Sequence, residues 1–291
     1  MHTRRIGTID VSAIGLGAMP LSIEGHPDRA RAIATVHAAL DAGITLLDTA
    51  DSYHWHAGER GHNEELLAQA LSTWSGDSSG ILVATKGGRT RPGDGSWTVN
   101  GTPGHIRTAC EGSLRRLGVA AIGLYQLHKP DPAVPWPDSV GALRDLIDAG
   151  LVRAAGISNV TCDQIHAARA ILGDSLVSVQ NRYSPQYRDS LPELRLCDRL
   201  GIAFLPWSPL GGIARSSLDG PGGPPPRTPF HAVAEERGTT PQQICLAWHL
   251  SHSKHVIPIP GATRPESARS SAQATALTLT EEELERLDAA A

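Results

Sequence analysis

The segment LDAGITLLDTADSY, residues 40–53, combines a helix end, a glycine and a short apolar strand. Glycine adopts the left-handed conformation that ends a helix at low cost, so Gly43 marks the C-terminus of that helix. The apolar run that follows is continuous rather than alternating, which is typical of a strand covered on both faces. The same order recurs in LRRLGVAAIGLYQL (114–127), LIDAGLVRAAGI (146–157), ILGDSLVSVQ (171–180) and CDRLGIAFLP (197–206). The recurring pattern predicts βαβ units with short loops between helix and strand.

The order of the predicted elements decides between two α/β architectures. We expect strands near 12–17, 44–48, 81–85, 122–127, 152–157, 176–180, 202–206 and 255–259. We expect helices near 28–42, 62–73, 103–117, 137–149, 161–171, 191–200, 229–252 with a break at Gly238, and 265–273. Eight strands alternating with eight helical regions predict a (β/α)8 TIM barrel with a parallel eight-stranded sheet. The rival, an open doubly wound sheet, needs a G-x-G-x-x-G turn into its first helix, and IGLGAMP at 14–20 is not followed by a helix.

Two segments fall outside this alternation. Residues 1–10 are expected to form an N-terminal hairpin that closes the floor of the barrel. Residues 211–228, GGIARSSLDGPGGPPPRT, are rich in Gly and Pro and follow the predicted seventh strand. A loop of this length in a compact domain is usually functional or disordered, and we interpret it as a lid or a cofactor clamp rather than a linker. We expect the whole chain, 1–291, to form one barrel domain.

Composition and charge argue against several classes of partner. The chain has 291 residues, of which 40% are hydrophobic and 19% charged, and its net charge is −4. Without a long basic run, neither nucleic acid nor an anionic membrane is an expected partner, and the apolar runs are too short to cross a bilayer. The first residues lack the apolar region of a signal peptide. Four scattered cysteines (Cys110, Cys162, Cys197 and Cys245) have no metal-ligand spacing, so we expect a reduced, cytoplasmic protein.

Four polar residues lie at or just beyond the ends of predicted strands. Asp48 ends ITLLD, Lys86 ends ILVATK and His128 ends IGLYQLH, and Tyr53 lies five residues after the aspartate. The carboxyl ends of parallel strands meet at one edge of the sheet, where α/β proteins carry their chemistry. Each residue alone also has an ordinary interpretation, as a turn cap, a packed phenol, a solvated lysine or a loop histidine. Their occurrence at successive strand ends favours a shared site.

A carboxylate, an ammonium, a phenol and an imidazole at one rim predict proton transfer. The ordinary pKa of tyrosine is about 10, and we expect the ammonium of Lys86 to lower the pKa of Tyr53. The carboxylate of Asp48 would hold that ammonium and offset its burial. Tyr53 could then protonate an oxygen that becomes an alkoxide, while His128 orients the same oxygen. Such a set protonates what another group reduces, so it requires a hydride donor.

The order of motifs along the chain resembles that of the aldo-keto reductase family. The similar segments are VSAIGLGAMPLS, DTADSY, GHNEELLAQAL, ATKGG, SLRRLGV, YQLHKPD, GISN, VQNRYSP, WSPLGG, PQQICLAW and PIPGATRPES. The resemblance runs nearly from end to end and implies a (β/α)8 barrel with NAD(P)H-dependent carbonyl reduction. It also implies that Asp48, Tyr53, Lys86 and His128 are catalytic, with Tyr53 as the general acid and base.

The resemblance further implies how the nicotinamide is held. Ser158, Asn159 and Gln180 correspond to residues that hydrogen-bond the carboxamide, and Trp207 corresponds to an aromatic ring that stacks on the nicotinamide. The other positions that match cofactor contacts of the family are Gly17, Met19, Asp48, Ser208, Leu210, Gly212, Gly261, Thr263 and Arg264. Within this set, the positions from 208 to 212 correspond to the pyrophosphate site.

The segment PGATR, residues 260–264, resembles the turn that receives the adenosine 2′-phosphate. A helix N-terminus favours an anion, and Arg264 adds a charge-assisted partner, so we expect NADP rather than NAD. The alternative for Arg264 is a solvated residue in the first turn of a helix. Two departures weaken the match at the adenine end: Gly261 replaces a common lysine, and Ser270-Ser271 replaces a Glu-Asn pair.

Other departures from the family pattern concern the substrate side. Tyr53 is followed by HWHAGER rather than the common Gly, and the chain ends soon after EEELERLDAA without a long tail. We therefore expect the segments 54–61, 87–101 and 211–228 to determine specificity. The residues expected to line the substrate pocket are His54, Trp55 and Trp97.

Two groups of histidines invite a metal hypothesis. The first group is His54, His56 and His62, and the second is His249, His252 and His255. Zinc sites need closely set ligands with supporting hydrogen bonds, which a loop does not favour. The second group runs along a helix end, where imidazoles suit the helix dipole. We expect no metal site.

These observations predict a cytoplasmic reductase that uses NADPH to convert small aldehydes or ketones to alcohols. We expect substrates with apolar or aromatic bodies, and a monomer rather than an oligomer. The alternative is a nucleotide-sensing regulatory subunit of the same fold with little turnover, which would need a surface for docking a partner.

Overall fold

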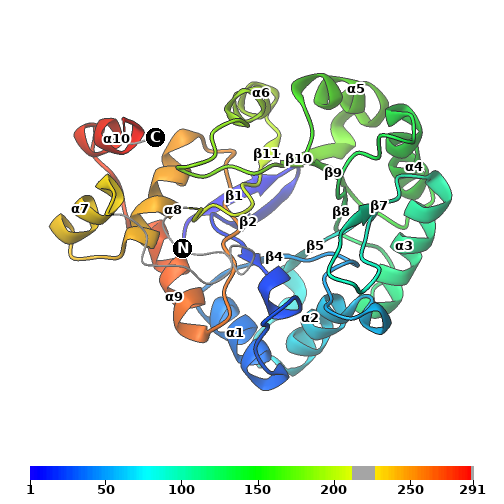
Figure 1. The fold of residues 1–291 in the computed structure, drawn as a ribbon, viewed down its shortest axis with the longest axis horizontal. Helices are drawn as coiled ribbons and strands as arrows, with labels where there is room; N and C mark the ends of the chain where they lie inside the picture. Colours follow the sequence, from blue (N-terminus) through cyan, green and yellow to red (C-terminus); the bar gives the residue numbers. More distant parts are fainter. Residues whose placement is uncertain (212–226, 290–291) are drawn as a thin grey trace.

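The computed structural model describes residues 1–211 and 227–289. Its strands are β1 (Thr3–Ile6), β2 (Ile9–Ser12), β3 (Leu16–Gly17), β4 (Leu46–Asp48), β5 (Leu82–Gly87), β6 (Arg89–Thr90), β7 (Thr98–Val99), β8 (Leu124–Leu127), β9 (Ala155–Ser158), β10 (Leu176–Gln180) and β11 (Ala203–Phe204). Seven of them form one parallel sheet in the order β11-β10-β9-β8-β5-β4-β3, in which each strand pairs with the next sheet strand along the chain; the β6–β7 hairpin lies between β5 and β8 in the sequence. The sheet curls into a barrel with helices outside it, which confirms the predicted fold (Figure 1).

The segment 255–260 occupies the eighth position and closes the barrel between β11 and β3. Phe204 on β11 exchanges two backbone hydrogen bonds of 2.8 Å with it, and the amide of Gly17 on β3 donates to the carbonyl of Pro260 at 3.0 Å. We expected a regular strand here, and the structure has only isolated bridges. The reason is that Pro258 and Pro260 have no amide hydrogen to contribute to a ladder.

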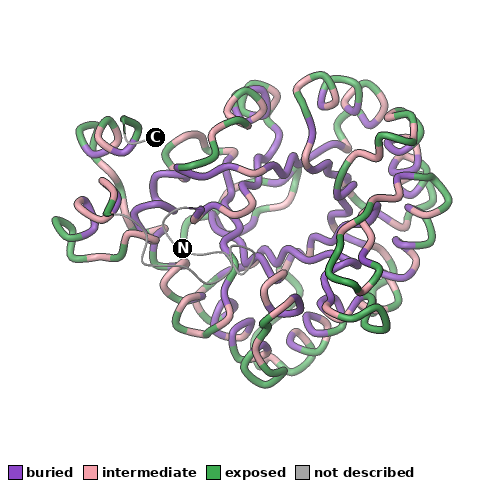
Figure 2. The backbone as a smooth tube through the Cα atoms, in the orientation of Figure 1, coloured by how far each residue is buried: buried purple, intermediate pink, exposed green. Residues whose placement is uncertain are grey.

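The helices of the described chain match the predicted ones closely. They are α1 (Arg29–Asp41), α2 (His62–Thr73), α3 (Pro103–Leu117), α4 (Trp136–Asp148), α5 (Cys162–Leu172), α6 (Leu191–Leu200), α7 (Pro229–Glu236), α8 (Pro241–His252), α9 (Pro265–Gln273) and α10 (Glu281–Asp288). The predicted break at Gly238 separates α7 from α8, and this glycine has a φ of 61°. The helices turn their buried faces to the strands, so the chain is buried at the centre and exposed outside (Figure 2).

The hairpin β1–β2 closes the floor of the barrel, as expected from residues 1–10. Its two strands are antiparallel, and Ile6 and Val11 are fully buried. They pack against the side chains at the starts of the barrel strands, including Leu46, Leu124 and Val177. The floor is therefore a small apolar core that ties the N-terminus to several strands at once.

The buried cysteines and the histidines near the end of α8 are electrically neutral. All four cysteines are free, and three of them (Cys110, Cys197 and Cys245) are buried in helices. Burial lowers the pKa of His249 to about 3 and that of His252 to about 4. The interpretation of these histidines as partners of the helix dipole is therefore wrong, because burial keeps the imidazoles uncharged. In the described ranges, no helix is both long and apolar enough to span a membrane.

Candidate active site

The structure brings the four polar residues from the strand ends together at one rim of the barrel. Asp48 is the last residue of β4, Lys86 lies near the end of β5, and His128 directly follows β8. Tyr53 reaches the same point from the loop after β4. All four side chains are buried, with at most 5% of any residue exposed.

Lys86 is the centre of this arrangement, because its ammonium donates three hydrogen bonds. Its Nζ lies 2.6 Å from Oδ2 of Asp48, 2.9 Å from the carbonyl oxygen of Thr49 and 3.1 Å from the hydroxyl of Tyr53. Burial by itself lowers the pKa of Lys86, but Asp48 and Tyr53 together raise it above its ordinary value. The lysine is therefore charged and fixed, with all three of its donors used.

Two glutamines hold the other oxygen of the Asp48 carboxylate. Nε2 of Gln180 donates to Oδ1 at 2.8 Å, and Nε2 of Gln126 donates to the same oxygen at 3.3 Å. Gln126 in turn accepts a hydrogen bond of 3.2 Å from Ser178. Gln126 was not among the predicted site residues. The available signal was an amide inside the apolar run IGLYQLH, two positions before His128.

The protonation state of Tyr53 differs from our expectation. Burial raises its pKa above the ordinary value of 10, the ammonium of Lys86 opposes that shift, and the carboxylate of Asp48 adds to it. The lysine acts in the expected direction, but the expected net lowering is wrong because loss of solvent has the larger effect on a fully buried phenol. Tyr53 therefore keeps its proton at neutral pH and is available as an acid.

His128 packs edge-on against Tyr53, with ring centroids 5.5 Å apart. Burial, followed by the nearby charges of Lys86, Arg89 and Lys129, lowers its pKa well below the ordinary value. Its Nδ1 lies 3.5 Å from the hydroxyl oxygen of Ser52. A neutral imidazole carries one N–H, which can orient an oxygen bound beside Tyr53.

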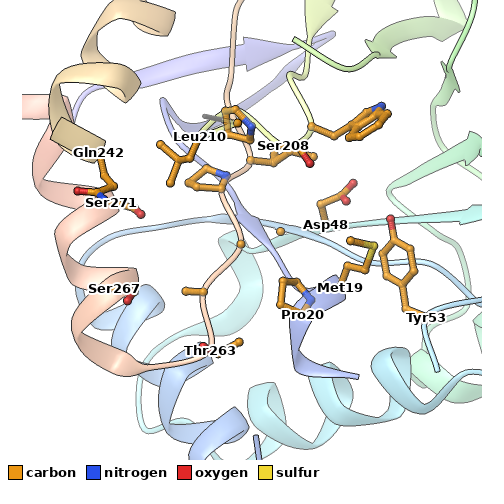
Figure 3. Close-up of a pocket in the computed structure, with 18 of the residues that line it drawn as sticks. Met19, Pro20, Asp48, Tyr53, Ser208, Leu210, Gln242, Thr263, Ser267 and Ser271 are labelled. Atoms are coloured by element: carbon orange, nitrogen blue, oxygen red, sulfur yellow. The ribbon is translucent and has the colours of Figure 1, made fainter. Parts of the chain in front are cut away.

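A cavity of about 930 Å³ opens beside these residues. It runs from Tyr53 and Asp48 at one end to Thr263 and Ser267 at the start of α9, with Gln242 on its far wall (Figure 3). The predicted cofactor residues that line it are Gly17, Met19, Asp48, Ser158, Asn159, Gln180, Trp207, Ser208, Leu210, Gly261, Thr263 and Arg264. Gly212 and the predicted lid or clamp at 211–228, apart from its ends, lie outside the described residues. The cavity is large enough for a dinucleotide.

Hydrogen bonds fix the middle of the cavity wall. Nε1 of Trp207 donates to Oδ1 of Asn159 at 3.2 Å, and Nδ2 of Asn159 donates to the carbonyl of His128 at 3.0 Å. Asn159 and Ser208 have positive φ angles of 59° and 49°. Such backbone strain in residues other than glycine clusters at binding sites, where the surroundings hold it in place. Trp207 is thereby linked to the catalytic rim through Asn159.

Two glycines of the wall are required by close contacts. A Cβ atom at Gly17 would lie 2.7 Å from the carbonyl oxygen of Ile259, and one at Gly261 would lie 2.7 Å from Cγ of Pro20.

Arg264 is the N-cap of α9, but no side chain caps that helix. The amides at this end of the helix are therefore available to an anion. Further lining residues that the sequence analysis did not assign as contacts are Arg89, Thr240, Gln242, Glu266, Ser267, Ser270 and Ser271.

The three residues predicted for the substrate pocket lie near the rim but make different contacts. Trp97 packs edge-on against Tyr53, with centroids 6.4 Å apart. His54 is buried, and its Nδ1 lies 2.8 Å from the carbonyl oxygen of His56. None of the three predicted residues, His54, Trp55 and Trp97, is among the residues that line the cavity. Within the described parts of the chain, no three His, Cys, Asp or Glu residues are grouped so as to hold a metal ion.

Comparison with known proteins identifies the family. The model of the Aldo/keto reductase family matches residues 13–291, so the chain belongs to this family of oxidoreductases. An uncharacterized oxidoreductase of Schizosaccharomyces pombe is 34% identical over 290 residues, which cover 98% of this chain and 89% of that protein.

Solved structures of the family have the same architecture. The glycerol dehydrogenase from Gluconobacter oxydans is 28% identical with a TM-score of 0.84, and the match covers 99% of this chain and 94% of that one. An aldo/keto reductase from Klebsiella pneumoniae, solved in complex with NADP and acetate, is also 28% identical, with a TM-score of 0.80 and the same coverage. Both agree with the barrel found here over almost its whole length.

Proposed function

We propose that the protein reduces aldehydes or ketones to alcohols with NADPH, and that Tyr53 is the proton donor. The observation that carries this proposal is the buried chain of hydrogen bonds from Asp48 through Lys86 to the hydroxyl of Tyr53. It ends at the wall of a cavity large enough for a cofactor and a small substrate.

The residues of the cavity fit a nicotinamide dinucleotide phosphate. The ring of Trp207, which donates a hydrogen bond to Asn159, would stack on the nicotinamide. Gln180 uses its Nε2 for Asp48, which leaves its Oε1 to accept a hydrogen bond from the carboxamide. When bound, the cofactor would supply the hydride, which none of these side chains can provide.

At the far end of the cavity, Arg264 and the uncapped start of α9 suit the 2′-phosphate. The Klebsiella pneumoniae relative was solved in complex with NADP, which supports the same choice here. We therefore propose NADPH rather than NADH as the natural reductant.

Proton delivery follows from the charges at the rim. Tyr53 is protonated, and its hydroxyl can hydrogen-bond the carbonyl oxygen of a substrate. As that oxygen gains negative charge, the proton of Tyr53 moves to it, and the adjacent Lys86 ammonium stabilises the phenolate that remains. His128 donates a second hydrogen bond that orients the oxygen. Asp48 keeps the lysine in place throughout.

The decisive experiment replaces Tyr53 with phenylalanine. Because general acid catalysis contributes about 10²- to 10⁴-fold, we expect Tyr53→Phe to lower kcat for a simple aldehyde by that factor. Binding of NADPH, followed by tryptophan fluorescence, should persist. The matched control is Tyr125→Phe, which removes the hydroxyl of a buried tyrosine whose hydroxyl bonds the carbonyl of Ile106 at 3.4 Å.

Equal rates for Tyr53→Phe and the wild type would refute the acid assignment. A wild-type protein that binds NADPH but reduces no carbonyl compound would instead favour the alternative, a nucleotide-sensing subunit. Light scattering would then show whether the protein forms the assembly that such a role requires.

A further inference from the structure

Two arginines stand two residues apart in the segment that follows β5, and their surroundings differ. Arg89 begins β6, which pairs with β7 in an antiparallel hairpin at the catalytic rim. Arg89 lines the same cavity as Tyr53 and His128, and Arg91 does not. The hairpin therefore brings one cation to the reacting end of the cavity.

The charge of Arg91 is balanced within the protein. Its guanidinium forms an ion pair with Glu24 and donates a hydrogen bond of 2.6 Å to the carbonyl oxygen of His54. Only 6% of Arg91 is exposed. Such a buried, ion-paired guanidinium is a structural feature of the loop that contains His54.

The charge of Arg89 has no such partner among the described residues. Its guanidinium carbon lies 4.3 Å from the ring centroid of Trp97, and no described carboxylate lies within ion-pair distance. Burial lowers the pKa of Arg89, and the phenol of Tyr53 is the one titratable group that acts against this shift. A half-buried cation without an anion is unfavourable unless a ligand supplies one. The planar guanidinium suits a carboxylate or a phosphate, which it can bind through two parallel hydrogen bonds.

The cofactor does not provide this anion, if it binds as proposed. Its 2′-phosphate would lie at the start of α9 beside Arg264, at the opposite end of the cavity from Tyr53 (Figure 3). Its pyrophosphate would lie along Ser208 and Leu210, on the segment after β11. The part of the cavity beside Arg89, Tyr53 and His128 is left to the substrate. Trp97 packs against the phenol ring of Tyr53 and against the guanidinium groups of both Arg89 and Arg91, so contact with Trp97 does not distinguish the two arginines.

We propose that the substrate is a small aldehyde or ketone bearing a carboxylate or phosphate, and that Arg89 binds this group while Tyr53 faces the carbonyl oxygen. This inference rests on the function proposed above and replaces the expectation of a purely apolar or aromatic substrate. The anionic group is not altered in the reaction. When bound, NADPH would supply the hydride for the carbonyl carbon while Tyr53 gives a proton to its oxygen, so the products would be NADP⁺ and a hydroxy acid or hydroxy phosphate.

Matched pairs of carbonyl compounds test this proposal on the whole protein. One pair is 4-oxobutanoate and butanal, and the other is glyceraldehyde 3-phosphate and glyceraldehyde. We expect the wild type to favour the anionic member of one pair by about 10- to 100-fold in kcat/KM, the range given by a charged hydrogen bond. The pair with the larger ratio identifies carboxylate or phosphate as the preferred group.

Variants assign the preference to Arg89. Arg89→Met should lower the ratio of kcat/KM between the anionic and neutral members about tenfold or more, mainly through KM. Arg89→Lys should keep part of the ratio, because it keeps the charge but loses the planar fork. Arg91→Met removes the same charge two residues away, and we expect the ratio to stay within about twofold because Glu24 already balances that arginine.

The outcomes separate this inference from the proposed function. A ratio near one in the wild type, or a ratio unchanged in Arg89→Met, would overturn the role of Arg89 even if butanal is reduced well. If neither member of either pair is reduced, the proposed function fails. A purely structural role for Arg89 on Trp97 predicts equal losses for both members of a pair.

Discussion

The two ends of the barrel are built from the same strands but from opposite kinds of side chain. At the floor, Leu46 and Leu82 begin β4 and β5 and pack against the N-terminal hairpin. At the rim, the same two strands carry Asp48 and Lys86, which are equally buried but charged. The floor gains free energy from apolar burial, whereas the rim depends on ion pairing to offset the loss of solvent.

This contrast shows how the fold separates stability from chemistry. The apolar cluster at the floor consists of side chains that carry no titratable group. The rim holds a charged lysine and a protonated tyrosine within 3.1 Å of each other. Substitutions at the floor should therefore affect stability alone, whereas substitutions at the rim should affect both stability and catalytic activity.

The largest effect on stability is expected at the rim. Asp48→Asn leaves the ammonium of Lys86 buried without its counter-charge, so we expect the free energy of unfolding to fall by about 3–5 kcal/mol. Urea denaturation measures this loss. The double variant Asp48→Asn, Lys86→Met should recover most of the stability while remaining inactive. A single variant as stable as the wild type would show that the pair is not effectively buried.

A smaller loss of stability, with no loss of catalytic activity, is expected at the floor. Ile6→Ala removes a fully buried side chain of the hairpin, which should lower the free energy of unfolding by about 3 kcal/mol and leave kcat unchanged. Ile9→Ala on the same hairpin is the control, because Ile9 is only partly buried and should lose less. If Ile6→Ala altered kcat as strongly as Tyr53→Phe, the two ends would not be independent.

The pH dependence of stability tests the claim that His249 and His252 on α8 are neutral. His249 and His252 have pKa values of about 3 and 4 in the fold, below the ordinary value of about 6.5 in the unfolded chain. Between these values the unfolded state binds more protons, so stability is complete above pH 6.5 and falls as the pH decreases. At pH 5 we expect a loss of about 2 kcal/mol per histidine.

The double variant His249→Gln, His252→Gln checks the source of that pH dependence. Its unfolding free energy, measured from pH 7 to pH 5, should fall less steeply than that of the wild type. An unchanged slope would mean that other groups cause the dependence.

The smallest effect is expected at the far end of the cavity. Arg264 is exposed, so its charge is partly screened by solvent, and Arg264→Ala should weaken NADPH binding by about 5- to 10-fold. Binding of NADH should change little, since it lacks the 2′-phosphate. Arg269→Ala, also exposed on α9 but not a cavity residue, is the control. Equal weakening of NADPH and NADH by Arg264→Ala would remove the argument for NADP.

Local sequence patterns were sufficient for the barrel and for the four residues at its rim. Five of the eight predicted strands follow a helix-ending glycine and consist of an apolar run, and these signals are local. Once the strands are parallel, their carboxyl ends must meet, so Asp48, Lys86 and His128 converge without any long-range information. Pro258 and Pro260 were visible in the sequence as well, and they account for the irregular eighth strand.

What only the tertiary structure decided is the electrostatic environment of each group. The net rise in the pKa of Tyr53 depends on the depth of its burial, and the two glutamines on Asp48 come from strands far along the chain. Arg89 and Arg91 look alike in the sequence, but Arg91 forms an ion pair with Glu24 whereas Arg89 lines the cavity. Residue type and spacing determine which groups reach the rim, whereas their charge and their free hydrogen-bonding capacity depend on neighbours that folding brings from elsewhere in the chain.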